Sequence, residues 1–209
     1  MSDTPSRPDS TAARKDRDVV SAASHHFLMY SGYVVMAYFW ALQEAGVEFT
    51  IIPADGAEAR CPLEETLALK RSLTPYNAAP LRMTCHQMAA LHIWERHVLR
   101  PQAEKIFDSP LRQIQTYGSF SCRNIAGTGV RSQHSYANAI DISGFVMQDG
   151  SEITVLQGWR AESTSRAMRK MHKAACGPFG TVLGPQADRF HQDHFHFDTA
   201  RYRSGTFCR

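Results

Sequence analysis

Two short segments of the chain carry histidine and aspartate at spacings that could bind a metal ion. The first holds His134 and Asp141, seven positions apart, and the second holds His194 and His196, two positions apart. Seven residues of straight strand span about 23 Å, so the chain must turn back between His134 and Asp141 for both to reach one ion. Residues 135–138 (SYAN) are mostly small and polar, as residues of such a turn usually are. We therefore expect the two segments to meet at one site.

Strand alternation gives each segment an apolar face and a polar face. Ile140 and Ile142 flank Asp141, which places the carboxylate on the opposite side of the strand. Residues 190–198 read FHQDHFHFD, so the last two phenylalanines share one face, and the last two histidines and the final aspartate share the other. Imidazole and carboxylate ligands without cysteine favour zinc among the divalent ions. We predict a zinc site with three protein ligands and an open fourth position, which is the catalytic arrangement.

A helix is expected before these segments. Residues 85–107 place apolar side chains at three- and four-residue spacing, with Thr84 suited to cap the first turn. Pro101 is expected to end or kink this helix. The apolar stripe consists of Met88, Leu91, Trp94 and Val98.

Strands and a second helix complete the expected fold. The expected strands cover residues 111–122, 139–147, 152–156 and 193–198. The turn sequence QDGS at 148–151 favours a hairpin, and residues 163–176 favour a helix that a Gly-Pro pair stops. Helices mixed with hairpin strands indicate an α+β fold, with a small antiparallel sheet and flanking helices.

The composition is that of a globular protein, with 43% hydrophobic and 21% charged residues among 209. The net charge of +3 is weak and there is no basic stripe interleaved with aromatics, so nucleic acid is not an expected partner. The five cysteines form no CxxC pair. Two disulfides with one remaining thiol would suit an oxidising compartment, and a set of buried reduced cysteines is the alternative.

The first part of the chain is expected to precede the folded domain, which we place at residues 50–209. Residues 1–24 are rich in serine, proline and charge, and are predicted to be disordered. Residues 25–45 form a hydrophobic segment, in which the 16 residues 27–42 carry no charge but fall short of the about 20 that cross a bilayer. An uncleaved membrane anchor, a poor signal peptide and a core helix all remain open for 27–42. With an anchor, the basic residues before it would put the N-terminus in the cytoplasm and the domain outside.

Residues 85–209 resemble the bacterial extensin-like C-terminal domain family. The resemblance is carried by Cys85, WE at 94–95, YGSFSCR at 117–123, NAIDISGF at 138–145, AC at 175–176, TVLGP at 181–185, HQDHFHFD at 191–198 and CR at 208–209. This family in turn resembles the zinc peptidases that share a fold with D-Ala-D-Ala carboxypeptidases, the murein endopeptidase and the Hedgehog signalling domain. The resemblance implies a Hedgehog/D-Ala-D-Ala peptidase-like fold.

The resemblance also implies roles for individual residues. It assigns the zinc ligands to His134, Asp141 and His196, and makes His194 a catalytic helper beside the metal. The pattern H-x-D-H-x-H at 191–196 matches the murein endopeptidases and makes His191 a second helper.

The chain departs from the pattern of its relatives at three positions. Gln133 and Ala137 stand where relatives often carry Glu and Gly, and neither position is a ligand. Asp193 stands where the dipeptidases use a Glu as base, and its shorter side chain leaves the identity of the base open.

The function expected from the site and the resemblance is zinc-dependent hydrolysis of peptide bonds in peptidoglycan stem peptides or cross-bridges. The protein would act on the periplasmic side of the bacterial inner membrane, anchored through residues 27–42 or secreted. Arg123 or Arg131 could hold a terminal carboxylate of the substrate. A catalytically inactive, zinc-containing module that binds the cell wall is the first alternative, and purely structural histidines are the second.

Overall fold

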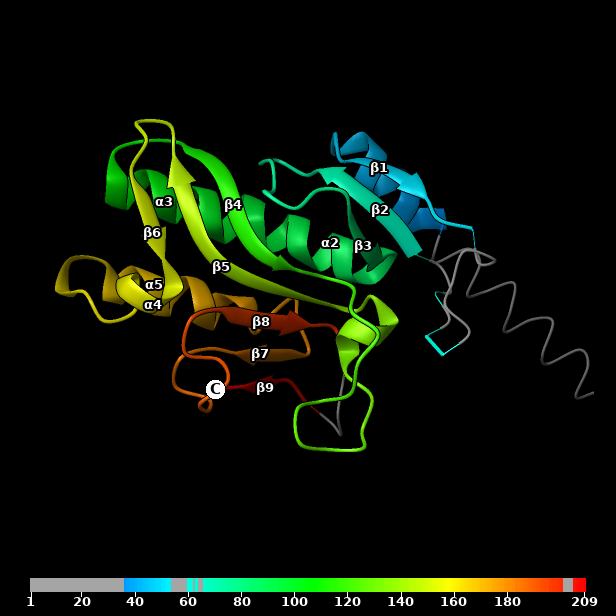
Figure 1. Ribbon diagram of the computed structural model, residues 1–209. Helices are drawn as coiled ribbons and strands as arrows, with labels where there is room; N and C mark the ends of the chain where they lie inside the picture. The colour runs from blue at the N-terminus through cyan, green and yellow to red at the C-terminus, as the bar shows by residue number, and fades with distance from the viewer. Residues whose placement is uncertain (1–35, 54–59, 62, 64–65, 201–204) are drawn as a thin grey trace, which may run out of the picture. The chain divides into compact units, whose positions relative to one another are not determined.

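The structure is a computed structural model that describes residues 36–53, 60–61, 63, 66–200 and 205–209 (Figure 1). Residues Ala41–Arg209 form one compact unit, which contains the elements discussed below. The predicted tail 1–24 and the first part of the hydrophobic segment 27–42 lie outside the described residues. Residues 36–44 are helical. Among the described residues, none of the helices combines the length and the apolar character that crossing a membrane requires.

A small antiparallel sheet precedes the first long helix. Its strands follow one another in the order β1 (Glu48–Ile51), β2 (Thr66–Arg71) and β3 (Leu81–Thr84). The side chains of Leu69 in β2 and Met83 in β3 are fully buried on one face of this sheet. The sequence analysis did not predict this sheet, because its strands are short and lack a sustained alternation.

The larger sheet has six strands, and it carries both segments that hold histidine and aspartate. The strands are β4 (Leu111–Gly118), β5 (Ala139–Met147), β6 (Glu152–Thr154), β7 (Thr181–Leu183), β8 (Phe195–Asp198) and β9 (Phe207–Cys208). The order is β4-β5-β8-β7-β9, with β6 paired to β5, and each pairing is antiparallel except that of β7 with β9. The predicted α+β class with an antiparallel sheet is confirmed.

The predicted boundaries hold for β5 and for the hairpin at 148–151, and they shift elsewhere. The run 152–156 pairs only to Thr154, because Val155–Gly158 turns into the short helix α4 with Thr154 as its cap. The last predicted strand begins at Phe195 rather than at 193. Strand β9 was not predicted, since two residues show no periodicity.

The predicted helix 85–107 is present, but Pro101 does not end it. It consists of α2 (Cys85–Trp94), a π-helical turn (Glu95–Leu99) and α3 (Arg100–Phe107), and the Thr84 hydroxyl accepts the Gln87 N–H at 3.1 Å as its cap. The π-helical turn contains one residue more than an α-helical turn. This wider turn before Pro101 lets the helix continue although proline has no backbone N–H to donate. The same insertion rotates the buried face, so that Leu99 is fully buried where Val98 was expected.

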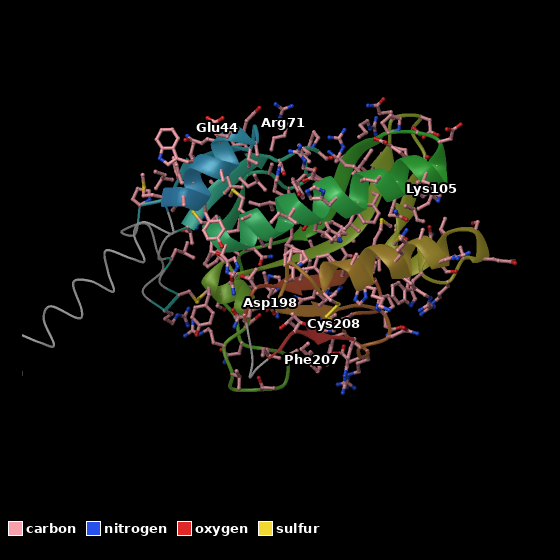
Figure 2. The ribbon with its side chains drawn as sticks, turned by 180° about the vertical axis from the view of Figure 1, so that it is seen from behind. Glu44, Arg71, Lys105, Asp198, Phe207 and Cys208 are labelled. Atoms are coloured by element: carbon pink, nitrogen blue, oxygen red, sulfur yellow. A yellow bond between two sulfur atoms is a disulfide. The ribbon has the colours of Figure 1, made fainter. Side chains whose placement is uncertain are left out.

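Helices α2, α3 and α5 (Glu162–Ala175) cover one face of the large sheet (Figures 1 and 2). The predicted helix 163–176 is thus confirmed with a shift of one residue. The ring of Trp94 packs edge-on against Phe197 at 5.2 Å and donates its indole N–H to the Met171 carbonyl at 2.9 Å. Phe195 and Phe197 are fully buried on this face, as the alternation predicted. The opposite face bears Asp141 in β5, His196 and Asp198 in β8, and Thr181 in β7.

Two disulfides are present, Cys61–Cys122 and Cys176–Cys208, and the buried Cys85 lies outside both. The expectation of two bridges and one remaining thiol is confirmed. One bridge holds the segment after β4, and the other joins the end of α5 to β9 (Figure 2).

Candidate metal centre

His134, Asp141 and His196 come from three elements and meet on the polar face of the large sheet. Asp141 lies in β5 and is the direct cross-strand partner of His196 in β8. His134 lies in a 3₁₀ turn, Gln133–Tyr136, that precedes β5. The turn closes with Ala137 in a left-handed conformation, φ 52°, and this reversal brings His134 back beside Asp141. Only glycine adopts this conformation at no steric cost.

Each histidine presents one nitrogen, and Asp141 presents both carboxylate oxygens, to a common point. His134 Nε2 lies 3.1 Å from Asp141 Oδ2 and 3.1 Å from His196 Nδ1, and His196 Nδ1 lies 2.9 Å from Asp141 Oδ1. Zinc bonds of about 2.0–2.1 Å in a tetrahedron imply ligand atoms about 3.3 Å apart. The spacing of these atoms therefore fits a small divalent ion.

Hydrogen bonds behind the cluster fix which ring nitrogen faces it. His134 Nδ1 donates to the Ser119 carbonyl at 2.7 Å, because a carbonyl can only accept. His196 Nε2 lies 3.1 Å from Asp198 Oδ2 and donates to it. Ligand histidines in metal sites usually donate their outer N–H to a carbonyl or a carboxylate in this way. In the neutral form of each ring, the lone pair of the inner nitrogen would then face Asp141, as a metal ligand requires.

The electrostatics of the cluster require a shared positive charge. Burial alone would raise the pKa of Asp141, but hydrogen bonds from His134 and His196 hold this pKa far below its ordinary value. Burial lowers the pKa of His196, yet the carboxylates of Asp141 and Asp198 outweigh it and raise this pKa to about 9. A proton on His196 or a bound cation can supply the charge, and metal binding would displace that proton.

His194 stands beside the three candidate ligands. Its Nε2 lies 3.7 Å from Asp141 Oδ1, while its Nδ1 lies 2.9 Å from Asp193 Oδ1. The Tyr117 hydroxyl donates to the other oxygen of Asp193 at 3.1 Å, and the Tyr117 ring meets the His194 ring edge-on at 5.6 Å. Asp193 thus orients His194, and in this geometry His194 Nε2 can accept a proton at the site.

His191 completes the group of histidines. Its ring centroid lies 5.2 Å from that of His194 and 5.8 Å from that of His196. Its Nδ1 is held by Asp188 Oδ1 at 2.8 Å. Burial lowers the pKa of His191 below its ordinary value although Asp188 opposes this, so that the imidazole is neutral near pH 7.

Residues 38–209 match the sequence family described as the extensin-like protein C-terminus. The chain belongs to this family. No curated protein and no solved structure matches the chain.

Four histidines of this extensin-like domain, His134, His191, His194 and His196, line a cavity of about 610 Å³ on the polar face of the sheet. Its volume falls in the range of sites that enclose small ligands or short peptide segments. Apolar walls surround the polar floor, and they are formed by Ile125, Leu183, Phe190 and Phe207.

The two arginines singled out from the sequence differ in position. Arg123 lines the cavity, and its backbone N–H donates to the Ser135 hydroxyl at 2.9 Å. The Arg131 guanidinium donates to the Arg60 carbonyl and lies against the sulfur atoms of the Cys61–Cys122 bridge. Of these two arginines, Arg123 is therefore the one that lines the cavity.

Several residues around the site were not assigned a role from the sequence. Ser119 acts through its backbone carbonyl, which no side-chain pattern can reveal. Asp198 shares the polar face of its strand with His196, and that alternation could have marked it as the outer partner of the ligand. Phe207 lies in a strand of two residues and gave no signal.

Proposed function

We propose that this extensin-like domain is a zinc-dependent peptidase that cleaves peptide bonds in peptidoglycan stem peptides or cross-bridges. The observation that carries the proposal is the convergence of His134 Nε2, His196 Nδ1 and the Asp141 carboxylate within 3.1 Å of one another. Both histidines have their outer nitrogens engaged elsewhere, which is the pattern of metal ligands.

His134, Asp141 and His196 would hold the zinc ion as three protein ligands. Zinc in such a site lowers the pKa of a bound water to about 7 and polarises a carbonyl oxygen. With two neutral imidazoles and one carboxylate as ligands, the zinc site would keep a net positive charge. That charge suits a substrate carbonyl and a developing oxyanion.

His194 would serve as general base and then as the donor to the leaving amine. Its Nε2 faces the site while Asp193, at 2.9 Å from Nδ1, stabilises the imidazolium that forms. The carboxylate of Asp193 is occupied by His194 and Tyr117, which suits it to orienting His194 rather than to acting as the base. His191 would orient the substrate or the attacking water from the adjoining wall of the cavity.

Arg123 would bind a carboxylate of the substrate in the same cavity. A planar guanidinium pairs with a carboxylate through two hydrogen bonds, which fixes orientation as well as adding affinity. We also propose that the fold is that of the D-Ala-D-Ala carboxypeptidase and Hedgehog group. The support is the sequence resemblance together with ligands at the matching positions of two adjacent strands.

We propose the periplasmic side of the inner membrane as the place of action. Two disulfides in a chain of this size are expected in an oxidising compartment. Delivery would use the hydrophobic segment at 27–42, as an anchor or as a signal.

The test measures metal content and hydrolysis on the full chain. Purified protein should hold about one zinc per chain by plasma mass spectrometry, His196→Ala should lose it, and His97→Ala, an exposed histidine of the π-helical turn, should keep it. The zinc protein should digest muropeptides, and His194→Ala should keep zinc but lose at least about a hundredfold in kcat.

Two outcomes would overturn the proposal. Zinc without hydrolysis would favour the wall-binding module, and a folded protein that binds no metal would favour structural histidines. Purification without chelators is essential, because a chelator would produce the second result artificially.

A further inference from the structure

The cavity extends from the candidate ligands across the sheet to strand β9. Thr181 in β7 is the cross-strand partner of Asp198 on one side and of Phe207 on the other. Paired residues point to the same face of a sheet, so these three side chains form one row on the face that bears the histidines. With strands about 4.8 Å apart, Phe207 lies about 10 Å from Asp198, roughly the length of three peptide residues.

Phe207 is held firmly although its side chain is 45% exposed. Its backbone N–H donates to the Gly180 carbonyl at 2.8 Å, and Arg209 exchanges bonds with Val182 and Gly184 at 2.9 and 3.0 Å. The neighbouring Cys208 is bonded to Cys176 at the end of α5 (Figure 2). A large apolar side chain that is fixed and exposed within a cavity is suited to contact a ligand.

Two walls of the cavity repeat the same arrangement. The Arg209 guanidinium lies over the Phe207 ring at 5.1 Å, and the Arg189 guanidinium lies over the Phe190 ring at 4.7 Å. Phe190, Phe207 and Arg123 all line the cavity. Each of these phenylalanines therefore has a guanidinium stacked on its ring, beside the cavity rather than among its lining residues, and Arg123 lines the cavity itself.

The acidic groups of the cavity are already engaged. Asp141 and Asp198 face His134 and His196, and Asp188 accepts from His191. These carboxylates thus have hydrogen bonds within the protein, and the arginines in and beside the cavity are the groups that can pair with an anion next to apolar groups.

We propose that this cavity selects peptides with several free carboxylates, which Arg123, Arg189 and Arg209 recognise while Phe190 and Phe207 contact the aliphatic parts. This inference rests on the proposed function and names the substrate class for the same site. Stem peptides whose carboxylates are free would be the substrates, and stem peptides in which these groups are amidated would bind poorly. Arg123, Arg189 and Arg209 are then specificity-determining residues, and Phe207 adds affinity without selecting between the two kinds of peptide.

The experiment compares two synthetic stem peptides of the same sequence, one with all carboxylates free and one with the carboxylates amidated. Binding is measured by calorimetry to zinc-loaded His194→Ala protein, so that no cleavage occurs. We expect the free-carboxylate peptide to bind at least about tenfold more tightly, and the difference to shrink as salt rises.

Binding to variants then shows which side chains recognise the peptide. Arg189→Gln and Arg209→Gln should each weaken binding of the free-carboxylate peptide about threefold, and the triple variant with Arg123→Gln at least about tenfold. Phe207→Ala should weaken both peptides equally. Arg112→Gln, an exposed arginine of β4, is the matched control and should change neither. Zinc content and melting temperature are recorded for each variant.

Equal binding of the two peptides would overturn the inference, as would a preference that survives in the triple variant, since zinc would then be reading the carboxylate. Either result can occur while hydrolysis persists, which keeps the failure of this inference separate from that of the proposed peptidase.

Discussion

His196 donates its Nε2–H to Asp198 at 3.1 Å, and this bond turns the opposite nitrogen, Nδ1, toward Asp141 and His134. Asp198 is almost fully buried, and its second oxygen accepts the Ala200 N–H at 2.9 Å. The carboxylate therefore holds a fixed orientation and increases the basicity of the imidazole that would bind a metal.

Asp198→Asn is expected to weaken zinc binding about tenfold to a hundredfold, because the amide keeps the shape but removes the charge that supports His196. Competition with a chromophoric chelator measures the dissociation constant. Asp149→Asn, in the exposed hairpin turn, is the control. An unchanged zinc affinity in Asp198→Asn would show that the outer hydrogen bond does not contribute.

Glu95→Gln is expected to stabilise the protein above neutral pH by about 1 kcal/mol, and to have little effect near pH 4. The Glu95 side chain is fully buried in the π-helical turn and accepts the Tyr76 hydroxyl at 3.2 Å. Burial raises the pKa of Glu95, although neighbouring hydroxyls oppose the shift. A carboxyl group whose pKa is higher in the folded state stabilises the fold most at pH values below its unfolded pKa. This stabilisation is lost as pH rises through the pKa of the folded state.

Urea unfolding of Glu95→Gln and wild type between pH 4 and 9 measures the difference in the free energy of unfolding. Glu104→Gln in α3 serves as the control. A difference that does not vary with pH would mean that Glu95 titrates normally in the folded protein.

His172→Gln is expected to remove part of the acid sensitivity of the fold. His172 packs against Trp159 and Phe195 at 5.4 and 5.2 Å, and burial lowers its pKa to about 4. The stability that comes from keeping this ring neutral is complete above its unfolded pKa of about 6.5, and it is lost as pH falls from there toward 4. The loss amounts to about 3 kcal/mol in wild type.

Thermal unfolding between pH 4 and 7 tests this, with His97→Gln as the exposed control. The comparison uses the slope of stability against pH, because the substitution itself lowers stability by disturbing the packing. Parallel slopes for His172→Gln and wild type would contradict the prediction.

Ala137→Gly is expected to change the free energy of unfolding by less than about 1 kcal/mol, because opposing effects nearly cancel. Relief of the left-handed conformation gains about 1–2 kcal/mol. Loss of a fully buried methyl group and the added freedom of the unfolded chain cost about as much. Ala137→Val should destabilise by more than about 2 kcal/mol, since a branched side chain cannot adopt φ 52° without strain.

The Ala137 variants also report on the site. Because the turn at Ala137 places His134, Ala137→Val should lower zinc content while Ala137→Gly keeps it. Urea unfolding and plasma mass spectrometry on the same samples measure both effects. Full zinc content in Ala137→Val would mean that His134 reaches the site without this turn.

The sequence by itself determined the features that depend on neighbours within about ten residues. Alternation placed Phe195 and Phe197 in the core, and three- and four-residue spacing predicted α5 and most of the α2–α3 helix. These patterns are local because a strand repeats every two residues and a helix every 3.6, so burial of one face leaves a readable period. The composition likewise indicated disulfides without their pairing.

Only the tertiary structure decided which groups meet. Alternation alone could not separate His194 from His196, but the register of β5 with β8 places His196 directly opposite Asp141. Ser119 contacts His134 through its backbone carbonyl, and Phe207 lies beside Thr181 in the sheet. Such contacts join residues that are distant in the sequence, so no local periodicity predicts them. Strand pairing and backbone hydrogen bonds between distant segments are fixed by packing of the whole domain. For this reason the residues that line the cavity could be identified only from the structure.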